Sequence, residues 1–313
     1  MLGLLKRFRE ALVIGIGGAG DVLGTIPTRN ALLTLGLRAR IGSVLWERMV
    51  LDPKPGPRRL EEVAEAEKVS RSLALVGPTS RLLDGPVPQA SVVAGALGEK
   101  VAVVDITAGP RETARGLREA MERLGVDLLI GIDVGGDVLA RPQDREVRSP
   151  LTDALMLSAL CLVPNSLLGI FGMACDGELP REVVEARLSE VAGKGGYLGA
   201  LGMAPQDVAL MERLSQGLVT EASRLPIEAA KGFRGTRLIR DGTRRAEVSI
   251  ISSITFYLDP LKAYELCPLA QAVREARSLE EANEALHGLG LFTELDRELE
   301  AARRGSTSYR GLP

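Results

Sequence analysis

Glycine-rich turns with acidic residues follow four short apolar runs of the sequence. The turns read GGAGD, TAGPR, DVGGD and ACDGE, and the acidic residues in or beside them are Asp21, Asp105, Asp133, Asp137, Asp176 and Glu178. Carboxylates at close range repel one another, so each needs a cation, a ligand rich in hydrogen-bond donors, or a raised pKa. Mg²⁺ prefers oxygen ligands of this kind, and glycine amides can approach an anionic phosphate closely. The repetition favours one shared site for a phosphorylated ligand over separate turns.

Three of these aspartates are the main candidates for chemistry. Asp21, Asp137 and Asp176 are expected to bind a metal ion or to act as general base. The same three residues together with Glu178 form the predicted metal-ligand set, and Mg²⁺ is the expected ion. A single aspartate beside a glycine is more often a turn former or a helix cap, so a shared site requires that the turns meet in space.

The first turn also matches a dinucleotide-binding pattern. Gly15, Gly17 and Gly20 have the spacing G-x-G-x-x-G, and Glu47 follows the second apolar run, where an acidic residue can hold a ribose. Asp21 opposes a bare pyrophosphate because the two negative charges repel. NAD or another adenosine nucleotide is therefore an alternative ligand. The residues predicted to contact the ligand are Gly15, Gly17, Gly18, Gly20, Thr25, Glu47, Gly135, Gly136 and Gly177.

Several other residues could serve such a site but also have ordinary structural explanations. Trp46 and Arg48 flank Glu47, and Trp46 is either part of a lid or a core residue. Cys175 has no histidine to activate it and is expected to be a buried thiol, while His287 is expected to end a helix. Cations that could neutralise phosphate, or lie on the solvated surface, are Arg29, Arg58, Arg141 and Lys194.

Composition limits the classes of function. The 39 basic and 41 acidic residues give a net charge of -2, and only 3% of residues are aromatic, so no nucleic-acid partner is expected. Three widely spaced cysteines fit a reducing cytoplasm better than a disulfide framework or a zinc site. Pro164 and Asn165 break the most apolar stretch, 154–174, so no membrane span is expected. We expect a soluble, cytoplasmic protein with a small-molecule ligand, and the sequence leaves association into a homo-oligomer open.

Apolar runs alternate with amphipathic stretches along the chain, which is typical of buried parallel strands joined by helices. Strands are predicted at 11–16, 40–46, 91–96, 100–106, 127–133, 166–172 and 254–260, with a hairpin at 237–250. Helices are predicted from the first turn to about Gly36, at 111–125, 149–162, 180–191 and 206–223, over most of the last fifty residues, and as a short segment within 59–70. The glycine-rich segment 194–203 is expected to form a flexible flap or turn, and the end of the chain a loose tail.

These elements predict a three-layer α/β fold with a mainly parallel, Rossmann-like sheet and helices on both faces. The chain is expected to form a single domain, with a core of about 10–192 and a helical and hairpin elaboration of about 193–313. Strand 11–16 should lie inside the sheet because ALVIGI has no polar alternation. The carboxyl ends of parallel strands share one edge, so the acidic turns should converge there, near a switch point in strand order.

Several stretches of the sequence resemble one family over nearly the whole chain. They are GGAGDVLGTIPT, LWERMVLDPKPGPR, DVGGDVLARPQD with SPLTDA, FGMACDGEL, ITFYLDP and FTELD. The sequence resembles the archaeal family known as domain of unknown function 1152. The resemblance implies an archaeal, cytoplasmic protein and implies no activity. Cys175 stands where a small residue would be expected, which weakens a catalytic role for its thiol.

Three functional hypotheses follow from these observations. The leading one is an enzyme, a metal-assisted transferase or hydrolase, that acts on a nucleotide or a phosphorylated metabolite. The second is a protein that binds NAD or an adenosine nucleotide, either as an oxidoreductase or as a non-catalytic sensor. The third is a subunit of an assembly, in which the glycine-rich turns only let the chain bend tightly and bind no ligand.

Overall fold

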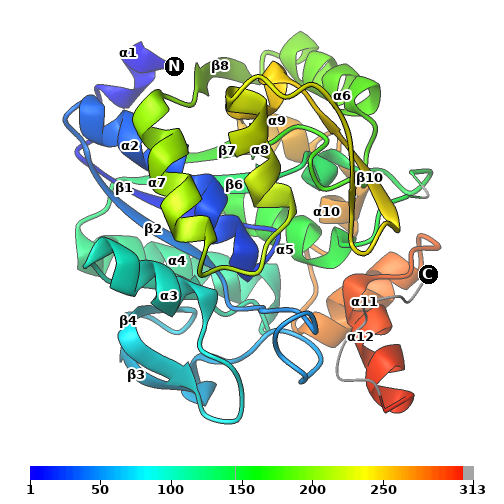
Figure 1. The fold of residues 1–313 in the computed structure, drawn as a ribbon. Helices are drawn as coiled ribbons and strands as arrows, with labels where there is room; N and C mark the ends of the chain where they lie inside the picture. The colour runs from blue at the N-terminus through cyan, green and yellow to red at the C-terminus, as the bar shows by residue number, and fades with distance from the viewer. Residues whose placement is uncertain (145, 306–313) are drawn as a thin grey trace.

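A nine-stranded sheet forms the centre of the molecule in the computed structural model, which describes residues 1–144 and 146–305 (Figure 1). Its strand order is β3-β4-β5-β2-β1-β6-β7-β11-β8. The five central strands run parallel: β5 (Val101–Val104), β2 (Arg38–Val44), β1 (Glu10–Gly15), β6 (Leu128–Val134) and β7 (Ser166–Phe171). The predicted mainly parallel, Rossmann-like sheet is therefore confirmed.

Antiparallel strands extend the sheet at both edges. β4 (Leu73–Leu82) pairs with β5 and with β3 (Val63–Lys68), whereas β11 (Ile254–Leu258) pairs with β7 and with β8 (Tyr197–Gly202). Two strands from the segment predicted as a C-terminal elaboration thus belong to the same sheet as β1.

Strand β1 lies in the interior of the sheet, as its uninterrupted apolar run predicts. It pairs with β2 on one side and β6 on the other, so that Val13 is level with Ile41 and Ile130. Every residue of the strand is buried. Leu12 and Ile14 point into one hydrophobic core and Val13 points into the other. A strand between two helical layers needs apolar side chains on both faces, which is the pattern of the sequence.

Helices cover both faces of the sheet and complete the three layers (Figure 1). The core that contains Leu12 is closed by α4 (Gly109–Leu124), α5 (Pro150–Leu160), α6 (Arg181–Gly193), α9 (Pro260–Tyr264), α10 (Pro268–Ala272), α11 (Leu279–His287) and α12 (Glu294–Arg303). The core that contains Val13 is closed by α1 (Leu2–Leu5), α2 (Ile26–Thr34), α3 (Gln89–Leu97), α7 (Pro205–Ser215) and α8 (Leu225–Ala230).

A separate hairpin of β9 (Gly235–Ile239) and β10 (Arg244–Val248) lies outside the main sheet. Arg240, Asp241 and Gly242 form its turn with positive φ, and the pairing of β9 with β10 confirms the hairpin predicted at 237–250. Part of the hairpin covers Cys175 in a small third core.

Several sequence predictions about elements were wrong or incomplete. Segment 91–96 lies in helix α3, segment 63–68 is strand β3, and segment 194–203 contains strand β8. Strand β4, at 73–82, was not predicted. In addition, only part of the predicted helix 206–223 is α-helical, in α7. The predicted loose tail lies, from residue 306 onward, outside the described residues.

The apolar stretch 154–174 forms most of α5, a turn and β7, as predicted; the helix and the strand are buried in the core, whereas Pro164 and Asn165 of the turn are exposed. Among the described residues, no helix combines the length and the apolar composition needed to cross a bilayer.

Candidate functional site

A pocket lies at the carboxyl ends of β1 and β6. From β1 the chain builds outward through β2 to β5, then returns to place β6 and β7 on the other side of β1. The order of the parallel strands thus reverses between β1 and β6, which is where ligands bind in open α/β sheets. The charged residues that line the pocket are Asp21, Glu47, Arg48, Asp133, Asp137, Arg148, Asp153, Asp176, Glu178, Arg240, Arg244, Glu294 and Arg297.

The turn after β1 folds back on itself around Asp21. The Gly17 amide donates to Asp21 Oδ2 at 2.9 Å, and the Ala19 amide donates to the carbonyl of Trp46 at 3.0 Å. A Cβ atom on Gly15 would lie 2.5 Å from the backbone carbonyl carbon of Asp21, so glycine is needed there for packing. Burial raises the pKa of Asp21 to about 7, against the lowering effects of the Gly17 amide and Arg48.

The turn after β6 supplies two further carboxylates. Asp133 ends the strand and accepts a hydrogen bond from the Gly136 amide at 2.8 Å, and Asp137 begins a 3-10 helix, Asp137–Leu139. Gly135 and Gly136 have φ of 139° and 111°, which disfavour other residues. A Cβ atom on Gly135 would overlap the carboxyl carbon of Asp176. Gly135 therefore makes room for the acidic residue from the neighbouring turn.

The turn after β7 brings Asp176 and Glu178 into the pocket, and the two residues differ in their partners. Glu178 accepts hydrogen bonds from the amides of Arg148 and Ser149 and from the Ser149 hydroxyl, and it pairs with Arg244 at 2.5 Å. Burial raises the pKa of Glu178, but Arg244, Ser149 and the two amides outweigh burial and lower that pKa to about 2. Neither carboxylate oxygen of Asp176 has a hydrogen-bond partner among the described residues.

Two pocket carboxylates come from helices and were missed by the sequence analysis. Asp153 lies in the first turns of α5 and is buried. Glu294 begins α12 and accepts hydrogen bonds from the amides of Leu151 and Thr152, so it caps α5. The stretches SPLTDA and FTELD, which carry part of the family resemblance, contain these residues and were the available signal.

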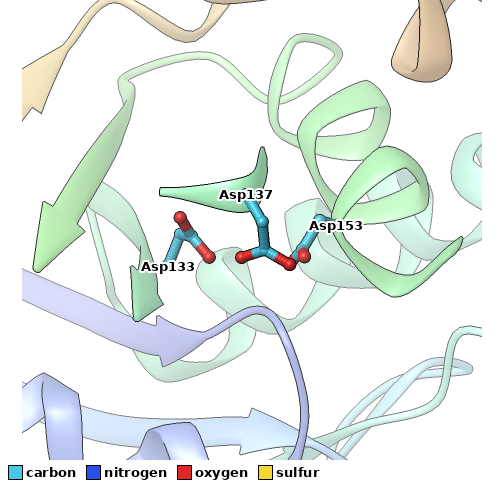
Figure 2. A group of neighbouring side chains, drawn as sticks. All are labelled: Asp133, Asp137 and Asp153. Carbon is cyan, nitrogen blue, oxygen red and sulfur yellow. The ribbon is translucent and has the colours of Figure 1, made fainter. Parts of the chain in front are cut away.

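The carboxylates form two groups that share Asp137. In the first trio, oxygens of Asp133, Asp137 and Asp153 lie within 4.8 Å of one another. Figure 2 shows Asp137 between the other two, with Asp133 at the end of β6 and Asp153 on α5. In the second trio, oxygens of Asp137, Asp176 and Glu178 meet the same limit. Asp137, Asp176 and Glu178 were in the predicted metal-ligand set, whereas Asp21 belongs to neither trio.

Burial and mutual repulsion perturb the carboxylates of both trios. Burial is the largest cause that raises the pKa of Asp133, Asp137 and Asp153, and neighbouring carboxylates raise each of them further. Burial and the adjacent Glu178 raise the pKa of Asp176 to about 7. Asp153 Oδ1, like both oxygens of Asp176, is buried and has no hydrogen-bond partner among the described residues. Such a group of carboxylates is stable only with shared protons or with bound cations.

Five arginines line the same pocket: Arg48, Arg148, Arg240, Arg244 and Arg297. Arg48 stacks on Trp46, with its guanidinium 4.1 Å from the ring centre, and donates to the Gly17 carbonyl. Burial lowers the pKa of Arg297, and Arg148 and Arg244 beside it lower that pKa further. Positive charge is therefore concentrated beside the carboxylates.

The cations proposed from the sequence lie elsewhere. Arg29 pairs with Glu99, Arg141 pairs with Glu190, and Lys194 is exposed. Arg58 is buried in an ion pair with Asp52, with 2.7 Å between Nε and Oδ2. None of the four lines the pocket, so their expected role beside a phosphate is not supported.

The predicted ligand-contact residues divide into two groups. Gly17, Gly18, Gly20 and Glu47 line the pocket. Residues that do not line it are Gly15, Thr25, Gly135, Gly136 and Gly177. The Thr25 hydroxyl donates to the carbonyl of Val22, and the glycines have packing roles.

The fourth acidic turn, after β5, does not reach the pocket. Asp105 accepts hydrogen bonds from the amides of Leu60 and Thr107 and from the Thr107 hydroxyl. This aspartate therefore has the ordinary turn-forming role, and only the turns after β1, β6 and β7 converge.

The remaining candidates from the sequence are structural. Trp46 is a core residue that borders the pocket, and its indole nitrogen donates to Glu298 at 2.9 Å. Cys175 is fully buried, and burial raises the pKa of its thiol to about 12. His287 is the last residue of α11 and contacts Asp296 at 2.8 Å. Ser149 directly precedes α5, but its hydroxyl donates to Glu178 instead of capping the helix.

The strand order and the pocket at its reversal define a Rossmann-like α/β protein. Comparison with known families identifies its family. The profile described as "Protein of unknown function (DUF1152)" matches residues 12–302, so the chain belongs to this family, as the resemblance predicted. No curated protein and no solved structure matches the chain.

Proposed function

We propose that this protein is an enzyme that binds a nucleotide or another phosphorylated small metabolite together with Mg²⁺ in the acidic pocket. The observation that carries the proposal is the combination of buried, unpartnered carboxylate oxygens with an arginine cluster in one pocket. The carboxylates suit a divalent cation and the arginines suit anionic oxygens of a phosphate. A ligand that is a metal complex of a phosphate offers both charges at once.

The residues present fit such a cation. Asp153 Oδ1 and both oxygens of Asp176 are buried acceptors that lack a donor among the described residues, so each can serve as a metal ligand without losing another contact. The ligand set consists of carboxylates, which suit Mg²⁺ or Mn²⁺ better than softer metals. When bound, Mg²⁺ would neutralise charge on phosphate oxygens and polarise them, as in a metal-assisted transferase or hydrolase.

Asp21 is the residue best suited to proton transfer. It lies in the pocket outside both trios, and its pKa of about 7 is close to the value that general acid–base catalysis favours. The Gly17 amide orients one of its oxygens. Because that amide and the Ala19 amide are engaged within the protein, we assign the phosphate to the arginines and the cation more than to the amides of the first turn.

A specific observation also favours the second candidate, a protein that binds NAD or another adenosine nucleotide as an oxidoreductase or sensor. Glu47 lies in the pocket after β2, where an acidic residue can hold ribose hydroxyls. One of its oxygens accepts from the Gln89 amide, whereas Oε2 is buried without a partner among the described residues. Glu47 is thus suited to accept a hydrogen bond from a ligand hydroxyl in either function.

A thermal-shift panel tests the proposal and separates the two candidates. ATP, ADP, NAD and inorganic pyrophosphate are each added to the protein with Mg²⁺ or with EDTA. The proposal predicts that phosphorylated compounds raise the melting temperature only with Mg²⁺. Stabilisation by NAD that is equal in EDTA would favour the second candidate, and no shift with any compound would count against both.

A further inference from the structure

The two trios differ from an ordinary single-cation site because they are separate groups joined through one residue. Asp133 and Asp153 contribute to the first trio only, and Asp176 and Glu178 contribute to the second trio only. Asp137 has oxygens close to both pairs. A carboxylate in this position can bind one cation with each of its two oxygens.

We propose that the pocket holds two divalent cations, one in each trio, with Asp137 as a ligand shared by both. The inference deepens the proposed function and rests on it. It assigns a second cation and names Asp133 and Asp153, which are outside the metal-ligand set expected from the sequence, as ligands.

Unpartnered oxygens supply evidence for each cation independently. In the first trio, Asp153 Oδ1 is buried and lacks a hydrogen-bond partner among the described residues. In the second trio, the same holds for both oxygens of Asp176. A buried acceptor without a partner is costly, so its occurrence in both trios indicates a ligand in both.

Charge supports two cations as well. The two trios contain five carboxylates, and Arg244 pairs with one of them, Glu178. Burial raises the pKa of the other four, Asp133, Asp137, Asp153 and Asp176, although Arg244 offsets part of the rise at Asp176. Two divalent cations would neutralise these four carboxylates, whereas one would leave two buried charges in repulsion.

Geometry also agrees with ions of this size. Mg²⁺ binds oxygens at about 2.1 Å, so two oxygens on opposite sides of the ion lie about 4 Å apart. The oxygens of each trio lie within 4.8 Å of one another, so a small closure of the side chains completes either site.

A pair of divalent cations specifies the class of substrate further. Two-cation sites hold a phosphate ester or diphosphate between the ions and stabilise both the attacking and the leaving oxygen in an in-line displacement. The arginine cluster beside the trios provides for the remaining anionic oxygens of such a substrate. The inference therefore favours a phosphate ester or a nucleoside diphosphate or triphosphate over a carboxylate or a sugar without phosphate.

Manganese binding tests the number of cations directly. Mn²⁺ is titrated into the full chain by equilibrium dialysis, and electron paramagnetic resonance then reports whether the bound ions are coupled to each other. We expect two Mn²⁺ per chain with a coupled spectrum. Asp153→Asn and Asp176→Asn should each bind one Mn²⁺ with an uncoupled spectrum, and Asp137→Asn should weaken both sites by at least about tenfold.

The controls distinguish loss of a ligand from loss of the fold. Asp84→Asn removes an exposed carboxylate in a turn distant from the trios in sequence and should bind two ions. Thermal melts in EDTA establish that each variant folds. One Mn²⁺ in the wild type, retained by either Asp153→Asn or Asp176→Asn, would overturn the two-cation inference and leave the proposed function standing. Two ions in all variants would overturn it by placing the ions elsewhere, and no bound Mn²⁺ would contradict both proposals.

Discussion

Asp176 and Glu178 show how different the surroundings of two nearby carboxylates can be. Glu178 is buried but has Arg244, a hydroxyl and two amides as partners, and its pKa falls to about 2. Asp176 is buried two residues earlier without a hydrogen-bond partner among the described residues, and its pKa rises to about 7. The first arrangement stabilises the fold, whereas the second costs folding free energy and is expected at a ligand site.

Replacing Asp176 with asparagine should therefore stabilise the metal-free protein. The rise of its pKa from 3.8 to about 7 corresponds to roughly 4 kcal/mol between the ionised and neutral forms, and the unpartnered amide of asparagine offsets part of this. We expect a gain of about 1–2 kcal/mol at pH 8 in EDTA, measured by urea unfolding, with Asp84→Asn unchanged. A loss of stability in Asp176→Asn would show that the carboxylate has a stabilising partner.

The same carboxylates set the pH dependence of stability in EDTA. Asp21 and Asp176 have folded-state pKa values of about 7, against 3.8 in the unfolded chain. Between about pH 4 and 7 the folded chain therefore holds protons that the unfolded chain has released, so their contribution is present at low pH and is lost as pH rises through 7. Unfolding free energy should fall by about 2–5 kcal/mol between pH 5 and 8, and less in Asp21→Asn. An unfolding free energy that increases between pH 5 and 8 would contradict the raised pKa values of Asp21 and Asp176.

At the scale of the elements, the hairpin β9–β10 is attached to the pocket through Arg244. Its guanidinium forms an ion pair with Glu178. Glu178 also accepts hydrogen bonds from the hydroxyl and the amide of Ser149, which precedes α5. The pair thus connects the hairpin to the turn after β7 and to α5. Glu178 is only 1% exposed, so its charge depends on these partners.

Arg244→Gln should consequently loosen the hairpin. Removing one partner of a buried ion pair leaves the other charge poorly compensated, and we expect a loss of about 2–3 kcal/mol in unfolding free energy. In this variant the backbone amides of β9 and β10 should exchange hydrogen faster than in the wild type, with a smaller increase in β1. A double-mutant cycle with Glu178→Gln measures the coupling between the two residues, and a coupling near zero would show that the hairpin does not depend on this ion pair.

The sequence predicted the elements that have strong local patterns and missed those decided by tertiary contacts. The five parallel strands are apolar runs, and all five lie where strands were predicted. The segment 91–96 contains valines that favour a strand, but Pro88 and the left-handed Gly98 bound it as a helix. The segment 63–68 is rich in Ala, Glu and Lys, yet pairing with β4 makes it an edge strand.

The candidate site was predictable to the extent that it lies in turns at strand ends. Asp21, Asp133, Asp137, Asp176 and Glu178 follow parallel strands, so fold class alone places them at one edge. Asp153 lies in the first turn of α5 and Glu294 begins α12, and nothing local connects them to the turns after the strands. The pocket arginines also come from scattered segments, whereas Arg58 has a buried partner of its own.

At the scale of the whole molecule, the reversal of strand order between β1 and β6 creates the pocket. Carboxylates from three turns and from α5 and α12 meet there with arginines from both the hairpin and α12. Residues from distant parts of the chain thus line one pocket. The fold keeps the carboxylates close together although they repel one another. We expect a phosphorylated ligand and a divalent cation to relieve this repulsion together.

Calorimetric titration of ADP tests this expectation most directly. ADP is titrated into the wild type, Asp21→Asn, Asp176→Asn and Asp84→Asn, each with saturating Mg²⁺ and each in EDTA. We expect the wild type and Asp84→Asn to bind ADP in Mg²⁺, with affinity at least about tenfold weaker in EDTA and in Asp176→Asn. Asp21→Asn should also weaken the Mg²⁺ complex. Binding of ADP that is equally strong in EDTA, or tighter without metal in Asp21→Asn, would contradict the account.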